Sequence, residues 1–129
     1  RDLCVTYAKL EDYEADVKQS YETLSNPENG LSTGKAYFCV GATKIMHCLF
    51  PELFVMVDQN VGRAVLGYSP GQYNNFTSYW KVMKICREEL MEWQKLYGNT
   101  DSLLELDLKP TTLTRIFDKC ASAMGKQGT

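Results

Sequence analysis

The stretch between Gly34 and Leu66 constrains the fold more than any other part of the chain. Its first half is apolar nearly all round, which is typical of a helix buried among other helices, and we place this core helix at about 33–49. A proline ends it, and the apolar run 54–57 is too short for another helix, so we expect a buried connector there. Asp58 follows directly and can cap the next helix by accepting a hydrogen bond from its first N–H groups.

Helical periodicity covers three further segments. In each of them apolar side chains recur at three- and four-residue steps while polar side chains take the other face. The expected helices are 3–24, 75–97 and 111–124, the last of which should stop at Gly125. No segment alternates as a strand does, and 129 residues suffice for one core. The sequence predicts an all-α single domain of five or six helices packed around the buried helix 33–49.

Composition argues against several classes of protein. No window of 18 uncharged apolar residues exists, so we expect no membrane span. The net charge of −2 disfavours general binding to nucleic acid, whose phosphates attract Lys and Arg. Charge is unevenly spread, however: residues 1–58 hold five basic and nine acidic side chains, and residues 59–129 hold nine and seven. A basic face on the C-terminal half therefore stays open as an alternative to ordinary charge scatter.

The cysteines and the single histidine bear on metals and on the compartment. Five cysteines form no C-x-x-C pair, and the only close pair of potential ligands is the adjacent His47-Cys48, which points to different sides of a helix. We therefore expect no metal site and no cofactor. An odd number of cysteines on apolar helix faces indicates buried thiols in a cytoplasmic protein.

Two segments in the opening stretch carry a recognisable pattern. They are Val40-Gly41-Ala42-Thr43-Lys44 and the run FVMVDQNVGRAVL at 54–66, both within residues 40–66. Together they resemble the core of the helix-hairpin-helix DNA glycosylases, in which a glycine hairpin lies on the DNA backbone and an apolar connector delivers an aspartate ahead of a helix. The resemblance implies a turn at Gly41, an Asp58 that assists departure of a flipped base and, as in lyase members, a lysine nucleophile at Lys44.

Each candidate site residue also has a structural interpretation. Asp58 is either an N-cap or a catalytic carboxylate, Lys44 either a solvated lysine or a nucleophile, and His47 either a satisfied core residue or an acid–base group. The aromatic side chains that could stack on bases are equally typical of a helix core. The remaining binding candidates are Gly41, Thr43, Asn60, Arg63, Tyr73 and Trp80.

Three functions from different classes remain open. The first is a non-catalytic binding or interaction domain that uses a glycosylase-like scaffold only as architecture. The second is a DNA-base glycosylase or lyase acting through Asp58 and Lys44. The third is an oligomer-forming structural protein with an aromatic interface. The corresponding partners are a protein or small ligand, a nucleic acid, or a second copy of the chain, and a pocket beside Asp58 and Lys44 would be the most informative observation.

Overall fold

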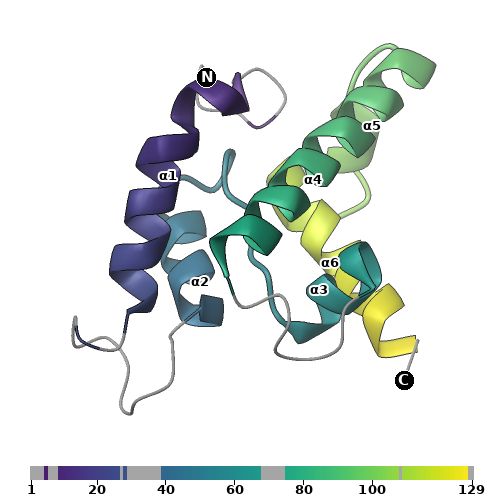
Figure 1. Ribbon diagram of the computed structural model, residues 1–129. Helices are drawn as coiled ribbons and strands as arrows, with labels where there is room; N and C mark the ends of the chain where they lie inside the picture. The colour runs from purple at the N-terminus through teal and green to yellow at the C-terminus, as the bar shows by residue number, and fades with distance from the viewer. Residues whose placement is uncertain are drawn as a thin grey trace.

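A computed structural model describes Val5 and residues 9–26, 28, 39–67, 75–107 and 109–127. Within these residues the chain forms six α-helices and no strand (Figure 1). The helices are α1 (Leu10–Ser25), α2 (Cys39–Leu49), α3 (Gln59–Leu66), α4 (Phe76–Tyr97), α5 (Asp101–Leu104) and α6 (Leu113–Gln127). The prediction of an all-α fold is therefore confirmed.

Helix α4 lies at the centre of the molecule. It packs against α1, α3 and α6, whereas α2 packs against α1 (Figure 1). Fully buried side chains line its inner face, among them Tyr79, Val82, Met83 and Cys86. Tyr21 of α1 stacks on Tyr79 with ring centroids 5.3 Å apart, which joins the two helices through a buried aromatic pair.

The prediction that helix 33–49 is buried on all sides is wrong in its described part. One face of α2 is buried, through Cys39, Ala42, Thr43 and Met46, but Leu49 is 66% exposed at its C-terminal end. The reason is position: α2 lies at the edge of the fold beside α1, so only one side of it meets other helices. Residues 33–38 lie outside the described residues.

Helices α1 and α6 differ from their predicted bounds. The sequence predicted a start for α1 at residue 3, but Lys9 has extended backbone, with φ −80° and ψ 97°, and the helix begins at Leu10. Helix α6 continues to Gln127 instead of stopping at Gly125. A Cβ atom on Gly125 would lie 2.0 Å from the backbone oxygen of Asn60, so this glycine permits close contact between α6 and α3 and does not end the helix.

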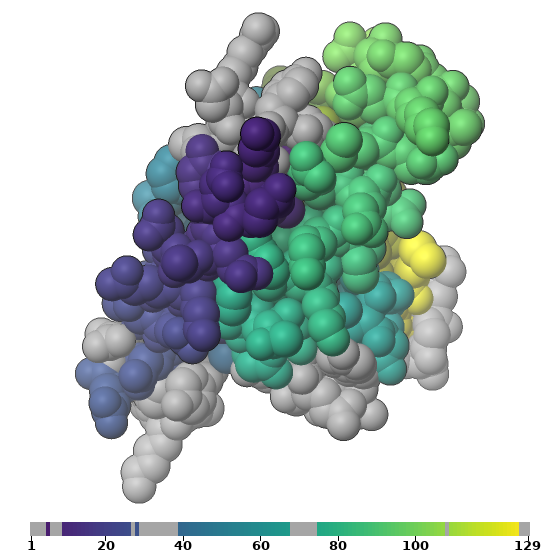
Figure 2. Space-filling view, turned by 45° about the horizontal axis from the view of Figure 1, so that its top comes forward, coloured from purple at the N-terminus to yellow at the C-terminus, as the bar shows by residue number. Residues whose placement is uncertain are grey.

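The segment between α4 and α6 is more structured than expected. Gly98 ends α4 with φ 83°, directly after the last residue of the predicted helix 75–97, and the connector that follows contains the four-residue helix α5. The end of α4 and the α5 segment project from the body of the molecule, in light green in Figure 2. Among the described residues, no helix is both long and apolar enough to cross a membrane.

Candidate functional site

The connector 54–57 is largely buried and non-helical, as the sequence predicted, and Thr43 holds it in place. The Thr43 hydroxyl accepts a hydrogen bond from the Val57 N–H at 3.0 Å and donates to the Val40 carbonyl at 2.9 Å. The Tyr79 hydroxyl donates to the Val55 carbonyl at 3.2 Å. The hydrogen bonds to Val57 and Val55 are buried, and they hold the connector in the position that places Asp58 at the start of α3.

Asp58 is the N-cap of α3. Its Oδ1 accepts a hydrogen bond from the Val61 N–H at 2.9 Å, and its backbone is extended, with φ −108° and ψ −174°. Gly67 ends the same helix with φ 70°. The capping interpretation of Asp58 is confirmed, although a cap occupies only part of a carboxylate and leaves room for a second role.

A polar cleft of about 570 Å³ opens beside Asp58, between α2, the connector, α3 and α6. Among the described residues, six charged side chains line it, and the four basic ones outnumber the two carboxylates. They are Lys44, Asp58, Arg115, Asp118, Lys119 and Lys126. The structure thus brings Lys44 and Asp58, the two catalytic candidates of the sequence, to one cavity together with a charged face of α6. We call this cavity the polar cleft.

Asp118 is the unusual group of the polar cleft. It is only 3% exposed, and its Oδ1 accepts a hydrogen bond from Arg115 Nη1. Its Oδ2 is buried without a hydrogen-bond partner among the described residues. Burial raises the pKa of Asp118 to about 6; Arg115 and His47 oppose this rise and Asp58 adds to it. The polar cleft therefore holds a carboxylate that ionises with difficulty.

The basic side chains of the polar cleft differ in whether they form ion pairs. Arg115 pairs with Asp118, and Lys119 Nζ pairs with Asp107 Oδ2. Lys44 is exposed and makes no ion pair with the described residues. Lys44 is therefore the cation best placed to attract an anionic ligand to the polar cleft.

His47 acts as a tether between α2 and the connector. Its Nδ1 donates to the Phe54 carbonyl at 2.7 Å, which fixes the tautomer with the proton on Nδ1. The half-buried ring is close enough to influence Asp118 electrostatically. His47 is not among the side chains that line the polar cleft.

Several other predicted site residues lie away from the polar cleft. Gly41 lies inside the continuous helix α2, so the glycine turn implied by the resemblance is not formed there. Trp80 is 5% exposed and stacks on Phe76 at 5.6 Å, which places it in the core and not on a ligand-binding surface. Arg63 Nη1 donates to the Gly125 carbonyl at 3.5 Å, on the α3–α6 contact.

The remaining candidates are structural or outside the described residues. The Thr43 hydroxyl is hydrogen-bonded to the connector, and the backbone of Asn60 packs against Gly125. Tyr73 lies outside the described residues.

The sequence analysis missed the contribution of α6. The first half of the predicted apolar stripe is buried, at Leu113 and Ile116, but its second half, Cys120 and Met124, is exposed. Small and polar residues on a neighbouring face are buried as well, namely Thr114, Asp118, Ala121 and Gly125. Their spacing of four, three and four residues is helical, so the signal that the sequence offered was a second face made of small and polar residues.

Metal and disulfide chemistry adds little to the site. In the part of the chain that the structure describes, no group of three or more His, Cys, Asp or Glu side chains is placed to hold a metal ion. Cys39 and Cys86 are buried as expected, whereas Cys48 and Cys120 are exposed thiols.

A scan against protein-family models and searches of curated proteins and of solved structures found nothing that matches this chain.

Proposed function

We propose that this protein is a non-catalytic binding domain whose ligand is a small anionic molecule held in the polar cleft. One observation carries the proposal: a buried carboxylate, Asp118, lines a cleft with four basic side chains and keeps one oxygen without a partner among the described residues. A hydroxyl or amine of the ligand would donate to this oxygen, and its anionic group would lie near Lys44.

The energetics of Asp118 support a ligand-binding role. A buried polar atom that lacks a hydrogen bond costs about 1–3 kcal/mol, and a charged one costs more. Folding alone gains nothing from such an arrangement, and groups held at a cost to stability are common where function requires them. With every group ionised, the four cations and two carboxylates give the lining a charge of +2, which favours an anion.

A second candidate function rests on the shared position of Asp58 and Lys44. Both line the polar cleft, as a glycosylase or lyase that acts on a flipped base would require. Against this candidate stand the missing turn at Gly41 and the use of Asp58 Oδ1 in the cap. Borohydride reduction with an abasic-site duplex distinguishes the two functions, because it would trap any imine formed by Lys44. The binding proposal expects no adduct.

A matched pair of ligands tests the binding proposal. Hydroxyethanesulfonate carries a permanent negative charge and a hydroxyl donor, and ethanesulfonate carries only the charge. Amide chemical shifts are followed while each is titrated at constant ionic strength. We expect the hydroxyl compound to bind more tightly, with the largest shifts on α6 and around Asp58.

Three variants identify the groups responsible. Asp118→Asn should abolish the preference for the hydroxyl compound, and Lys44→Ala should weaken both compounds. Lys84→Ala, at an exposed lysine of α4 outside the polar cleft, should change neither. Equal binding of the two compounds to the wild type, or shifts confined to other parts of the protein, would contradict the proposal.

A further inference from the structure

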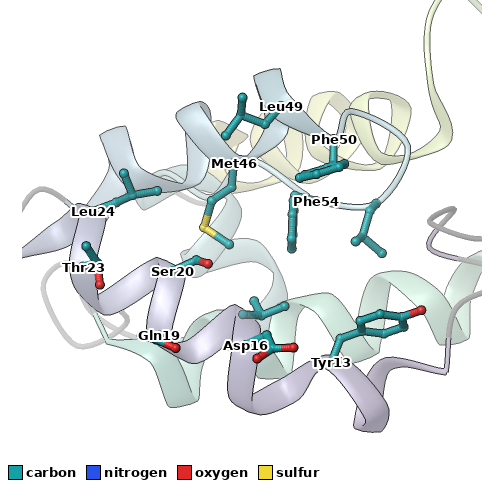
Figure 3. A pocket seen from close by; sticks show the side chains of 12 residues that line it. Tyr13, Asp16, Gln19, Ser20, Thr23, Leu24, Met46, Leu49, Phe50 and Phe54 are labelled. Carbon is teal, nitrogen blue, oxygen red and sulfur yellow. The ribbon is translucent and has the colours of Figure 1, made fainter.

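An apolar groove lies between α1 and α2. Its volume is about 530 Å³, and Figure 3 shows the side chains that form it. Tyr13 and Leu24 lie at the two ends of the α1 wall. Met46 and Leu49 of α2, with Phe50 directly after it, form what we call the α2 wall. We call this cavity the apolar groove. It shares no lining residue with the polar cleft.

The α2 wall of the apolar groove leaves large apolar side chains in water. Leu49 is 66% exposed and Phe50 is 45% exposed, although they adjoin the buried Met46 and Phe54. Adjacent exposed apolar side chains around a concave surface mark interaction sites more often than isolated ones do. Methionine, here Met46, also adapts its shape to a partner, as in other grooves that bind helices.

The dimensions of the apolar groove fit a helix. Its α1 wall runs from Tyr13 to Leu24, which at about 1.5 Å per residue is roughly 16 Å, or three helical turns. The two helices are in contact, and the lining side chains are spread along α1 from Tyr13 to Leu24, so the depression is elongated. Apolar anchors at i, i+3 or i+4, and i+7 of a bound helix would span this distance.

The charge around the apolar groove selects the character of that helix. Among the described residues that line the groove, Asp16 is the one charged side chain and none is basic. Asp12 lies one turn earlier on the same side of α1, and Glu52 is exposed just beyond α2. A partner that carries Lys or Arg beside its apolar anchors would complement these carboxylates.

We infer that the apolar groove is the docking site for an amphipathic helix of a protein partner, about three turns long, with basic side chains flanking its apolar stripe. The apolar anchors would cover Leu49 and Phe50, and the basic flank would face Asp16. This interaction is separate from ligand binding in the polar cleft, so each can fail without the other.

A pair of synthetic peptides tests this inference. The first is an acetylated and amidated helix of about 15 residues, roughly four turns, with leucine at i, i+3, i+4 and i+7 and lysine on the polar face. The second carries glutamate in place of every lysine. Fluorescence anisotropy measures affinity, and amide chemical shifts locate the binding surface. We expect the lysine peptide to bind at least about tenfold more tightly, with shifts on α1 and α2.

Two pairs of variants provide the controls. Leu49→Ser should weaken the lysine peptide by about tenfold or more, whereas Leu96→Ser, at a leucine that is 67% exposed near the end of α4, should have no effect. Asp16→Lys should remove the preference for the lysine peptide, and Glu92→Lys, on the exposed face of α4, should preserve it. All four positions lie on the surface, so the variants should fold, and circular dichroism verifies this.

Three results would overturn the inference. Equal binding of the two peptides would show that the carboxylates beside the groove do not select a basic helix. Equal effects of the two leucine substitutions would show that the apolar groove is not the binding site. A dimer of the unliganded protein that Leu49→Ser dissociates would show that the occupant is a second copy of this chain and not a helix of another protein.

Discussion

Asparagine in place of Asp118 should stabilise the protein at neutral pH, because it retains the shape of the side chain and removes a charge that burial opposes. The pKa of Asp118 rises from 3.8 to about 6, and each pKa unit corresponds to about 1.36 kcal/mol, so ionised Asp118 costs the folded state roughly 3 kcal/mol. The pKa of about 6 already includes the effect of Arg115, which lowers it and so offsets part of the rise caused by burial. Because Arg115 is 41% exposed, water can replace its contact with the carboxylate when asparagine is present.

The pH dependence follows from the direction of this shift. Since the folded protein holds the Asp118 proton more tightly than the unfolded chain does, its free energy of unfolding falls as pH rises from about 4 to 6. Below the unfolded pKa both states are protonated, and the cost disappears. The difference between Asp118→Asn and wild type should therefore approach zero below about pH 3 and reach about 1–3 kcal/mol in favour of the variant at about pH 7.5.

Urea unfolding across this pH range measures the difference, and Asp101→Asn serves as the control, since Asp101 is an exposed carboxylate in the first turn of α5. Subtracting the wild-type curve isolates Asp118 from the other acidic side chains. A variant that is less stable than wild type at about pH 7.5, or a difference that does not change with pH, would refute the reasoning. Ionised Asp118 would then be well accommodated, and the argument for a ligand at its Oδ2 would lose its energetic basis.

Three further substitutions test the framework of the polar cleft. Asp58→Asn should leave the thermal midpoint near that of wild type because Asn caps as well as Asp, whereas Asp58→Ala should lower it by roughly 3–6 °C, or about 1 kcal/mol, in calorimetry. Gly125→Ala should lower the free energy of unfolding by about 1–3 kcal/mol in urea unfolding, since its Cβ would clash with the backbone of Asn60. Alanine in place of glycine inside a helix usually stabilises a protein, so the sign of this effect is informative. Thr43→Val should cost a similar 1–3 kcal/mol by leaving the buried Val57 N–H without its acceptor, whereas an unchanged urea midpoint would mean that the connector is held by other contacts.

Local chemistry is the part of the fold that the sequence could predict. Asp58 and Gly67 bracket α3, and Asn75 and Gly98 bracket α4, as expected for side chains that satisfy free backbone groups at helix ends. The Asn75 side chain accepts from the Ser78 N–H at 2.8 Å, which repeats the capping geometry of Asp58. These features depend only on residues within one helical turn, so single-sequence reasoning is sufficient for them.

Features that depend on which helices meet could not be predicted in the same way. Gly125 has the usual signature of a helix end, and only its contact with Asn60 shows why glycine is needed inside α6. Asp118 has the pattern of a solvated charge until α6 packs with that face inward. Helix α2 was expected at the centre because its sequence is apolar, yet hydrophobicity does not distinguish a core helix from one that borders an apolar groove.

The pH dependence of ligand binding should show what Asp118 contributes to the polar cleft. A ligand hydroxyl that donates to Oδ2 requires the ionised carboxylate, so affinity for hydroxyethanesulfonate should be constant above the pKa of about 6 and fall by up to about tenfold per pH unit below it. Ethanesulfonate lacks the donor, and the sulfonate itself does not titrate, so its affinity should vary much less. Calorimetric titrations of both compounds between about pH 5 and 7.5 give the comparison. If hydroxyethanesulfonate instead binds more tightly at low pH, protonated Asp118 is the donor, and the natural ligand must present an acceptor to it.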